Sequence, residues 1–328
     1  MAWWMGNPRK VLFFKPLGSK VEALCDTIIL MTPELEPTNI KDKVKSDHRA
    51  KTISTTIDEL NTSLNTLGIT NYDIPNTEII FKEQKENQSP LLGHVEVYPS
   101  KPSPVEIVFD ERFATPQKEQ PYVQQLHENG IGYIGMQQAL KHELAHISMW
   151  SITKQERQAA TRTIDEGWAN LVQTTTDTLP IEQTKQNIKE LQTQKPEILD
   201  KCLNFSKVTI YEERLNTAES KTGQALLLWI HQGYGVDKMI ELIQKSPEYQ
   251  KRDDELEGNS FELAVLDKET HKTYSEYISL LKNIKSGKIE PNIAKQKLRE
   301  IEGKQVEYAL VETTNSKDIQ EVKAKFLK

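Results

Sequence analysis

The sequence predicts an α+β fold, in which a small, mainly antiparallel sheet is followed by a largely helical C-terminal part. Two patterns predict it. Between residues 77 and 109, three short runs rich in β-branched and aromatic residues alternate with turn-forming residues, which is typical of strands. From Met136 onward, apolar residues recur instead at spacings of three and four, the period of helices. The 328 residues are enough for one large domain or two modest ones.

Before the sheet, residues 41–67 carry the pattern of an amphipathic helix. The apolar positions recur at spacings of four and three, at Ile53, Ile57, Leu60, Leu64 and Leu67. Gly68 follows the last of them, where glycine commonly ends a helix. The three predicted strands come next, at Thr77–Phe81, His94–Tyr98 and Val105–Phe109.

The second half of the chain is divided into helices by its breakers. Pro180 separates one helix from the next, because proline cannot continue a helix. The apolar run at 225–230 is too short for a membrane and fits a buried helix. Tyr274–Ile284 has the stripe of another amphipathic helix, and Gly287 and Pro291 mark a turn after it. We expect three regions: an N-terminal segment with the amphipathic helix at 1–75, a central domain at 76–245 and a helical C-terminal region at 246–328.

Composition narrows the classes of function. The formal net charge is −6 and charges of both signs are interspersed, so the chain lacks the basic surface expected of a nucleic-acid-binding protein. No segment reaches the ~18–20 apolar residues needed to span a bilayer. The start of the chain lacks the order of a signal peptide, so we expect a cytoplasmic protein, with export by a route without a cleavable signal as the alternative. Cys25 and Cys202 form neither a disulfide framework nor a CxxC pair, so any metal must be bound by histidines and carboxylates.

The segment His142–His146 (HELAH) contains the pattern HExxH. Residues four apart on a helix differ by about 40° in direction, so His142 and His146 project together and can bind one metal ion. Glu143 lies one residue along, beside the ion, where its carboxylate can take a proton from a water molecule on the ion. Leu140 and Leu144 fall on the opposite side, where they would anchor the helix in the core.

A zinc ion needs a third protein ligand, and the sequence offers one twenty residues after the second histidine. Ile164, Trp168 and Leu171 share one face of a predicted helix, and Glu166 points the other way. The segment 153–162 is long enough to reverse the chain, so this helix can pack beside the first and aim Glu166 at the histidines. The predicted Zn²⁺ ligands are His142, His146 and Glu166.

These residues resemble the gluzincin metallopeptidases, the thermolysin-like clan, in which HExxH is followed by a glutamate on a later helix. Asp165–Asn170 is similar to the E-G-x-A form of the bacterial peptidase-MA-like branches, and Thr222–Gly235 is similar to their apolar helix ending in Tyr-Gly. The resemblance covers about Ile107 to Leu242. It implies that residues 76–245 form a zincin-like catalytic domain, that Glu143 is the general base, and that Zn²⁺ is the cofactor.

The resemblance also implies a tyrosine or histidine that binds the oxyanion of the tetrahedral intermediate. Where related sequences place the tyrosine, this chain has Ser220 or nearby polar residues. Tyr211, His231 and Tyr234 are the candidates, although a lone histidine in an apolar helix is more often structural. Asn170 stands where the family often has an acidic residue that orients the first histidine, and its carbonyl can accept from an imidazole N–H without supplying a charge.

A sheet edge just upstream of the zinc helix pairs with extended substrate in this family, which would be the role of the strand Val105–Phe109. The alternatives are that this strand is an ordinary core strand, or that Gly130–Gly135 forms the rim, where glycines let a backbone approach a ligand. The expected function is hydrolysis of peptide bonds in a peptide or protein substrate, by Glu143-assisted attack of a zinc-activated water. The alternatives are a catalytically inactive zincin-fold protein that binds peptide or a protein partner, and a structural protein that acts through its helical C-terminal half. The oligomeric state is left open.

Overall fold

The computed structural model describes residues 13–14, 28–29, 40–72, 74, 77–82, 93–97, 105–114, 119–124, 135–153, 161–207, 216–246 and 272–328. Helices dominate these residues, and a small sheet makes the fold α+β, as predicted. The chain divides into two compact units, one of residues 1–65 and 70–151, the other of residues 66–69 and 152–328. The three expected domains remain a prediction, because compactness alone does not show which part folds independently.

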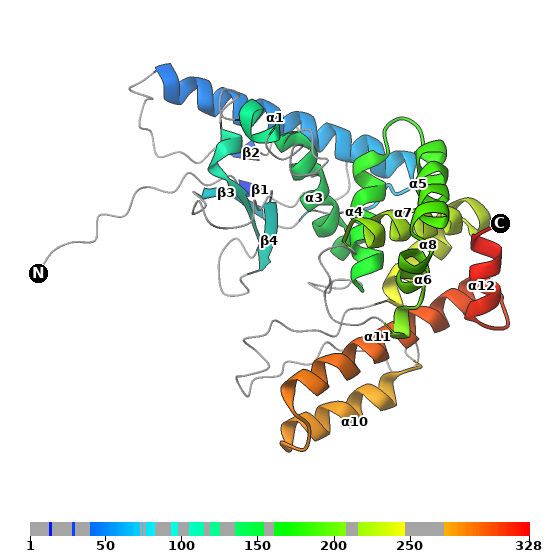
Figure 1. Cartoon of the computed structure of the whole chain (residues 1–328). Coiled ribbons are helices and arrows are strands. Elements are labelled where there is room, and N and C mark those ends of the chain that lie inside the picture. The colour runs from blue at the N-terminus through cyan, green and yellow to red at the C-terminus, as the bar shows by residue number, and fades with distance from the viewer. Residues whose placement is uncertain are drawn as a thin grey trace, which may run out of the picture. The chain divides into compact units, whose positions relative to one another are not determined.

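The first unit holds every described strand and the helix that carries HELAH (Figure 1). A short helix over residues 119–124 also belongs to it. The other elements are β1 (Phe13–Phe14), β2 (Ile28–Ile29), α1 (Ile40–Thr66), β3 (Thr77–Lys82), β4 (Gly93–Val97), β5 (Val105–Asp110), η2 (Glu111–Ala114) and α3 (Met136–Thr153).

The sheet of β3, β4 and β5 is mixed, so the prediction of a mainly antiparallel sheet was wrong for it. The strand order is β3-β5-β4, with β3 parallel to β5 and β4 antiparallel to β5. Three strands joined as a simple meander would all be antiparallel neighbours. Here β5 lies between the two earlier strands, and the connections between the strands leave it parallel to β3 and antiparallel to β4. The separate pair of β1 and β2 is antiparallel.

This strand order also corrects the expectation that Val105–Phe109 is a substrate-binding edge. That strand is β5, and it is hydrogen-bonded to β3 on one side and to β4 on the other. A strand with both edges occupied cannot accept a further strand. Its side chains Val105, Ile107 and Phe109 are all at most 1% exposed, so β5 is a core strand.

Helix α1 confirms the amphipathic pattern predicted for residues 41–67. The five apolar positions of its stripe are buried, at Ile53, Ile57, Leu60, Leu64 and Leu67. Gly68 has a φ of 79°, the left-handed conformation that ends helices and that glycine adopts without strain.

The described secondary-structure elements of the second unit are all helices. It contains α4 (Arg162–Thr174), α5 (Ile181–Gln194), α6 (Pro196–Leu203), η3 (Phe205–Lys207), α7 (Asn216–Tyr234), α8 (Val236–Gln244), α10 (Tyr274–Lys285), α11 (Pro291–Thr313) and α12 (Ile319–Phe326). The apolar run at 225–230 lies in α7 and is buried except for the half-buried Trp229, as predicted. None of the helices in the described parts of the chain is long and apolar enough to cross a membrane.

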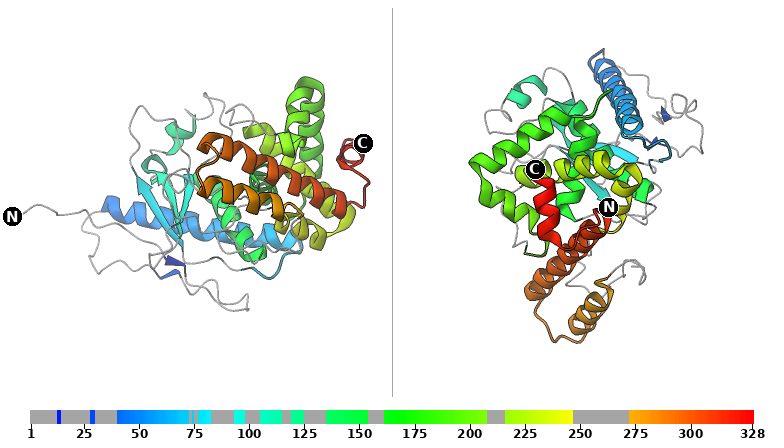
Figure 2. Two further views of the ribbon diagram at one scale, coloured as in Figure 1. Left: turned by 90° about the horizontal axis from the view of Figure 1, so that it is seen from below. Right: turned by 90° about the vertical axis from the view of Figure 1, so that its right-hand side faces the viewer.

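Helices α10 and α11 form a hairpin and run side by side in both views of Figure 2. Gly287 in the turn has a φ of 67°, and Pro291 stands at the first position of α11, as the sequence predicted. The hairpin has its own apolar cluster, which consists of Tyr277, Leu280, Leu281, Leu298 and Ile301.

Candidate metal centre

The start of α3 is held by residues that lie outside the HELAH motif. The carboxylate of Glu119 accepts a hydrogen bond of 2.7 Å from the backbone N–H of Met136, the first residue of the helix. A negative charge at this end also interacts favourably with the helix dipole. Gly135, just before the helix, has a φ of 147°, and a Cβ there would press against the Glu119 carboxylate. Gly135 therefore has a structural reason to be glycine, and the other residues of the predicted rim, 130–134, lie outside the described residues.

The rotation of α3 follows from its apolar side, as predicted. Leu140, Leu144 and Ile147 are completely buried. On the same helix, Gln137 donates a hydrogen bond of 2.6 Å from Nε2 to the Glu59 carboxylate of α1. The helix thus has both an apolar anchor and a polar tie, and His142 and His146 share a different side of it.

The two histidines are brought together at a distance that suits coordination. Their Nε2 atoms lie 3.2 Å apart, and the rings meet edge to face at 81°. Two nitrogens that bind one zinc ion at ~2.0–2.1 Å with an angle of about 109° lie about 3.3 Å apart. Without a metal ion, the same separation suits an N–H···N hydrogen bond, so the histidine pair by itself does not identify a metal site.

The third member of the group is Glu166 on α4. One ligand atom each from His142, His146 and Glu166 lies within 4.8 Å of the others, so the three side chains can hold a metal ion. His142 is 6% exposed, and the other two side chains are half-buried. Two imidazoles and one carboxylate are a ligand set of catalytic zinc sites, in which the fourth position stays open for water or substrate. The donor atoms therefore fit the predicted ion.

Helix α4 lies against α7 (Figure 1), and the two backbones are in contact at a pair of glycines. A Cβ on Gly223 of α7 would overlap the carbonyl oxygen of Thr163 and would lie 2.9 Å from the Cα of Gly167. A Cβ on Gly167 would in turn overlap the backbone of Gly223. Both residues must be glycine for the helices to cross this closely. Gly167 directly follows Glu166, so the close crossing lies next to the third member of the group.

The buried face of α4 agrees with the sequence prediction. Ile164, Trp168 and Leu171 are completely buried, and Glu166 lies on another side of the helix. Asn170, one turn beyond Glu166, donates a hydrogen bond of 2.7 Å from Nδ2 to the side-chain oxygen of Gln224. Its predicted role beside the first histidine stays a prediction.

The sequence analysis did not identify Gln224 or the glycine crossing. Gln224 could have been identified, because it is the one strongly polar residue of the segment Gln224–Ile230. A polar side chain that is buried in an apolar helix needs a hydrogen-bond partner. The signal for the crossing was weaker. Small residues occur on many helices, and the sequence does not show which helices meet.

The structure describes two of the three candidates for oxyanion binding, His231 and Tyr234. Tyr211 lies outside the described residues. His231, near the end of α7, donates from Nε2 to the carbonyl oxygen of Leu67 at 3.1 Å. Tyr234 is half-buried and packs edge to face against Trp229, with ring centroids 5.6 Å apart. The Nε2 proton of His231 is therefore engaged with the backbone at the end of α1, and its role in oxyanion binding stays a prediction.

The electrostatic surroundings of α3 include a buried lysine. Lys141, next to His142, is 4% exposed, and this burial lowers its pKa, while the charge of Glu59 acts in the opposite direction.

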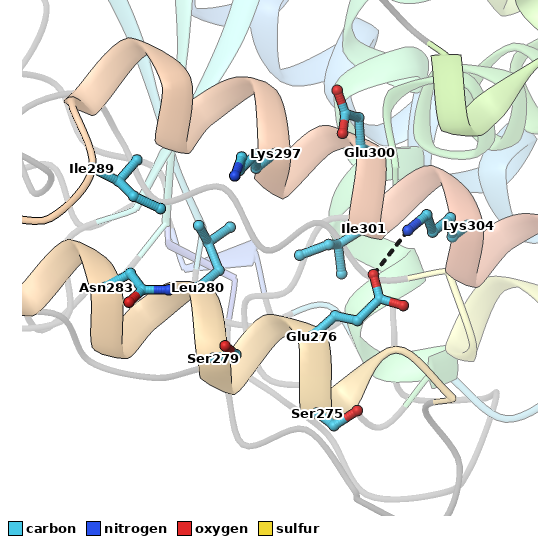
Figure 3. A pocket seen from close by; sticks show the side chains of 10 residues that line it. All are labelled: Ser275, Glu276, Ser279, Leu280, Asn283, Ile289, Lys297, Glu300, Ile301 and Lys304. Carbon is cyan, nitrogen blue, oxygen red and sulfur yellow. Dashed lines mark hydrogen bonds and ion pairs between the residues drawn. The ribbon is translucent and has the colours of Figure 1, made fainter.

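A hollow of about 470 Å³ lies in the hairpin of α10 and α11 (Figure 3). Leu280, Ile289 and Ile301 form its apolar lining, and Glu276 and Lys304 are ion-paired with each other at 2.9 Å. No histidine or cysteine lines it. Of its two carboxylates, Glu276 is ion-paired with Lys304, and the only group of three possible metal ligands found among the described residues is that of α3 and α4.

No family model, no curated protein and no solved structure matches the chain. The resemblance to the gluzincins therefore depends on the residues of its motifs alone.

Proposed function

We propose that the chain is a zinc-dependent peptidase in which His142, His146 and Glu166 hold the metal ion and Glu143 is the general base. The observation that carries this proposal is the ligand group. Three side chains with the HExxH-plus-glutamate spacing have ligand atoms within 4.8 Å of one another. The separation of 3.2 Å between the two Nε2 atoms supports binding of one shared ion.

A bound zinc ion would supply Lewis acidity, by lowering the pKa of water toward ~7 and polarising the scissile carbonyl. The chain's own part in the reaction belongs to Glu143. It follows His142 directly on α3 and is half-buried, and it is not a member of the three-residue ligand group. It takes the proton of the attacking water and passes it to the leaving amine. Tyr211 and His231 are the proposed donors to the oxyanion.

The decisive experiment compares Glu143→Gln with the unchanged chain, both loaded with zinc, on a diverse peptide library. Glutamine has the shape of glutamate but cannot accept the proton, so we expect unchanged zinc content and a loss of turnover of at least ~100-fold. Glu182→Gln is the matched control, because that side chain is 87% exposed on α5. Full turnover in Glu143→Gln would refute the mechanism.

A zincin-fold protein that binds peptide without cleaving it is the second candidate. The hydrogen bond of His231 to the Leu67 carbonyl favours it, because that bond occupies one of the two proposed oxyanion donors. This candidate predicts about one zinc ion per chain, saturable binding of library peptides and no cleavage of any of them. Detection of a single specific cleavage product would exclude it.

A further inference from the structure

A stripe of polar side chains runs along α4 from the proposed ligand. Glu166, Asn170 and Thr174 are spaced four residues apart, so each is turned by only about 40° from the one before it. The neighbouring side chains Trp168, Leu171 and Val172 are completely buried. Any rotation of α4 that displaces Glu166 therefore displaces Asn170 and Thr174 with it.

Gln224 of α7 joins the other two members of this stripe. It is 1% exposed. Its Oε1 accepts from Nδ2 of Asn170 at 2.7 Å, and its Nε2 donates to Oγ1 of Thr174 at 2.7 Å. Oγ1 of Thr174 donates to the backbone carbonyl of Asn170 at 2.7 Å, which closes the ring.

Only one assignment of donors and acceptors satisfies all three hydrogen bonds of the ring. The single proton of Thr174 goes to a backbone carbonyl, so its hydroxyl oxygen must accept from Gln224. Because Nε2 of Gln224 donates to Thr174, Oε1 of Gln224 faces Asn170 and accepts a hydrogen bond from Nδ2 of Asn170. The carbonyl oxygen Oδ1 of Asn170 is therefore turned away from Gln224. The ring thus determines the orientation of both amides.

The glycine crossing and the polar ring restrain different motions of α4. Gly167 and Gly223 allow backbone contact, which sets the separation of α4 and α7. The glycine contact itself has no interlocking side chains, so rotation and sliding of α4 are opposed by its buried apolar side chains Trp168, Leu171 and Val172 and by the ring. The ring contributes to this resistance, since either motion would leave the buried amide of Gln224 without its hydrogen bonds.

We propose that Gln224 is a positioning residue for the metal site, which acts by fixing the rotation of α4 and so the direction of Glu166. This inference rests on the proposed function. A functional constellation must be held within ~0.5 Å and ~10–20°. Residues that orient ligands typically change metal affinity 10–100-fold when they are replaced. The side-chain hydrogen bonds of Gln224 go to Asn170 and Thr174 of α4, so its effect on Glu166 passes through α4.

The test measures zinc affinity of the full chain by competition with a chelating dye, together with the visible spectrum of the Co²⁺-loaded protein. Gln224→Met keeps the length of the side chain and removes both hydrogen bonds. We expect zinc to bind 10–100-fold more weakly and the Co²⁺ spectrum to change, because the carboxylate ligand is displaced. Thr174→Val removes only one bond of the ring and should weaken binding less, which keeps the test informative if Gln224→Met does not fold.

The matched control is Thr222→Val. Thr222 is completely buried on the same helix, and its hydroxyl has no hydrogen-bond partner on α4. It should leave zinc affinity and the Co²⁺ spectrum unchanged even if it alters stability. Wild-type affinity and an unchanged spectrum in both Gln224→Met and Thr174→Val would overturn this inference alone. A wild-type chain that binds no zinc would overturn the proposed function and this inference together.

Discussion

Gly167 and Gly223 meet where α4 crosses α7, so closely that a Cβ on Gly223 would lie 2.9 Å from the Cα of Gly167. Both helices approach to backbone contact at the residue that follows the proposed ligand Glu166. A glycine in the middle of a helix normally costs ~0.5–1 kcal/mol relative to alanine. Here the cost is offset by the close approach of two buried helices, and the contact links the core of the second unit to the carboxylate.

Gly223→Ala should destabilise the protein, because its methyl group would overlap the Thr163 carbonyl. We expect a loss of roughly 1–3 kcal/mol in the free energy of unfolding, typical of forced overpacking. Urea denaturation measures it. Gly233→Ala is the control on the same helix, since a Cβ there would meet no atom within 4 Å. It should raise stability by up to ~1 kcal/mol, and equal effects of the two substitutions would argue against the crossing.

Glu166→Ala should abolish high-affinity metal binding. Elemental analysis of protein purified without a metal-affinity tag should find about one zinc ion per wild-type chain and far less in the variant. Zinc at about 100 times its dissociation constant should stabilise the wild-type chain by ~2.7 kcal/mol, and a chelator should remove this gain. Glu182→Ala, at an exposed position of α5, is the control. An equal zinc content in Glu166→Ala and the wild type would eliminate Glu166 as a ligand.

His231→Ala should lower stability and leave the zinc content unchanged. The variant removes the hydrogen bond from Nε2 to the Leu67 carbonyl at the end of α1. The expected loss in the free energy of unfolding is ~0.5–1.5 kcal/mol. Gln232→Ala, at the exposed neighbouring position, should have little effect. If turnover falls while stability stays at the wild-type value, His231 acts on the oxyanion and its bond to Leu67 is incidental.

The Cys202 thiol should be unreactive in the folded protein. Burial raises its pKa to about 12, and the charge of Glu219 acts in the same direction. In a Cys25→Ser background, a disulfide reagent at pH about 8 should modify Cys202 slowly until denaturant is added, because little thiolate is present and access is blocked. Rapid reaction under native conditions would show that Cys202 is accessible.

The same pKa shift predicts a pH dependence of stability. A group whose pKa is higher in the folded state binds its proton more tightly there. The contribution of Cys202 is therefore fully present below the ordinary pKa of 9.0 and is lost as the pH rises toward about 12. Urea denaturation at a series of alkaline pH values should show a smaller decrease for Cys202→Ala than for its parent over this interval.

Much of the local structure could be predicted from the sequence. The stripe of α1, the burial of Leu140 and Leu144 on α3, and the burial of Trp168 on α4 all follow from periods of three and four residues. The common direction of His142 and His146 could also be predicted, because it depends only on the geometry of one helix. The end of α1 at Gly68 could be predicted as well, because glycine adopts the positive φ that ends a helix whatever its distant neighbours are.

The order of the strands and the partner of α4 could not be predicted in this way. That β5 lies between β3 and β4 depends on hydrogen bonds between segments distant in the sequence. Which residues share a face of each helix follows from the sequence alone, and this includes the histidines and the glutamate of the proposed site. The contacts of Gly167 with Gly223 and of Gln224 with Asn170 and Thr174 are visible only in the folded chain, because the periodic pattern of a helix does not show which other helix packs against it.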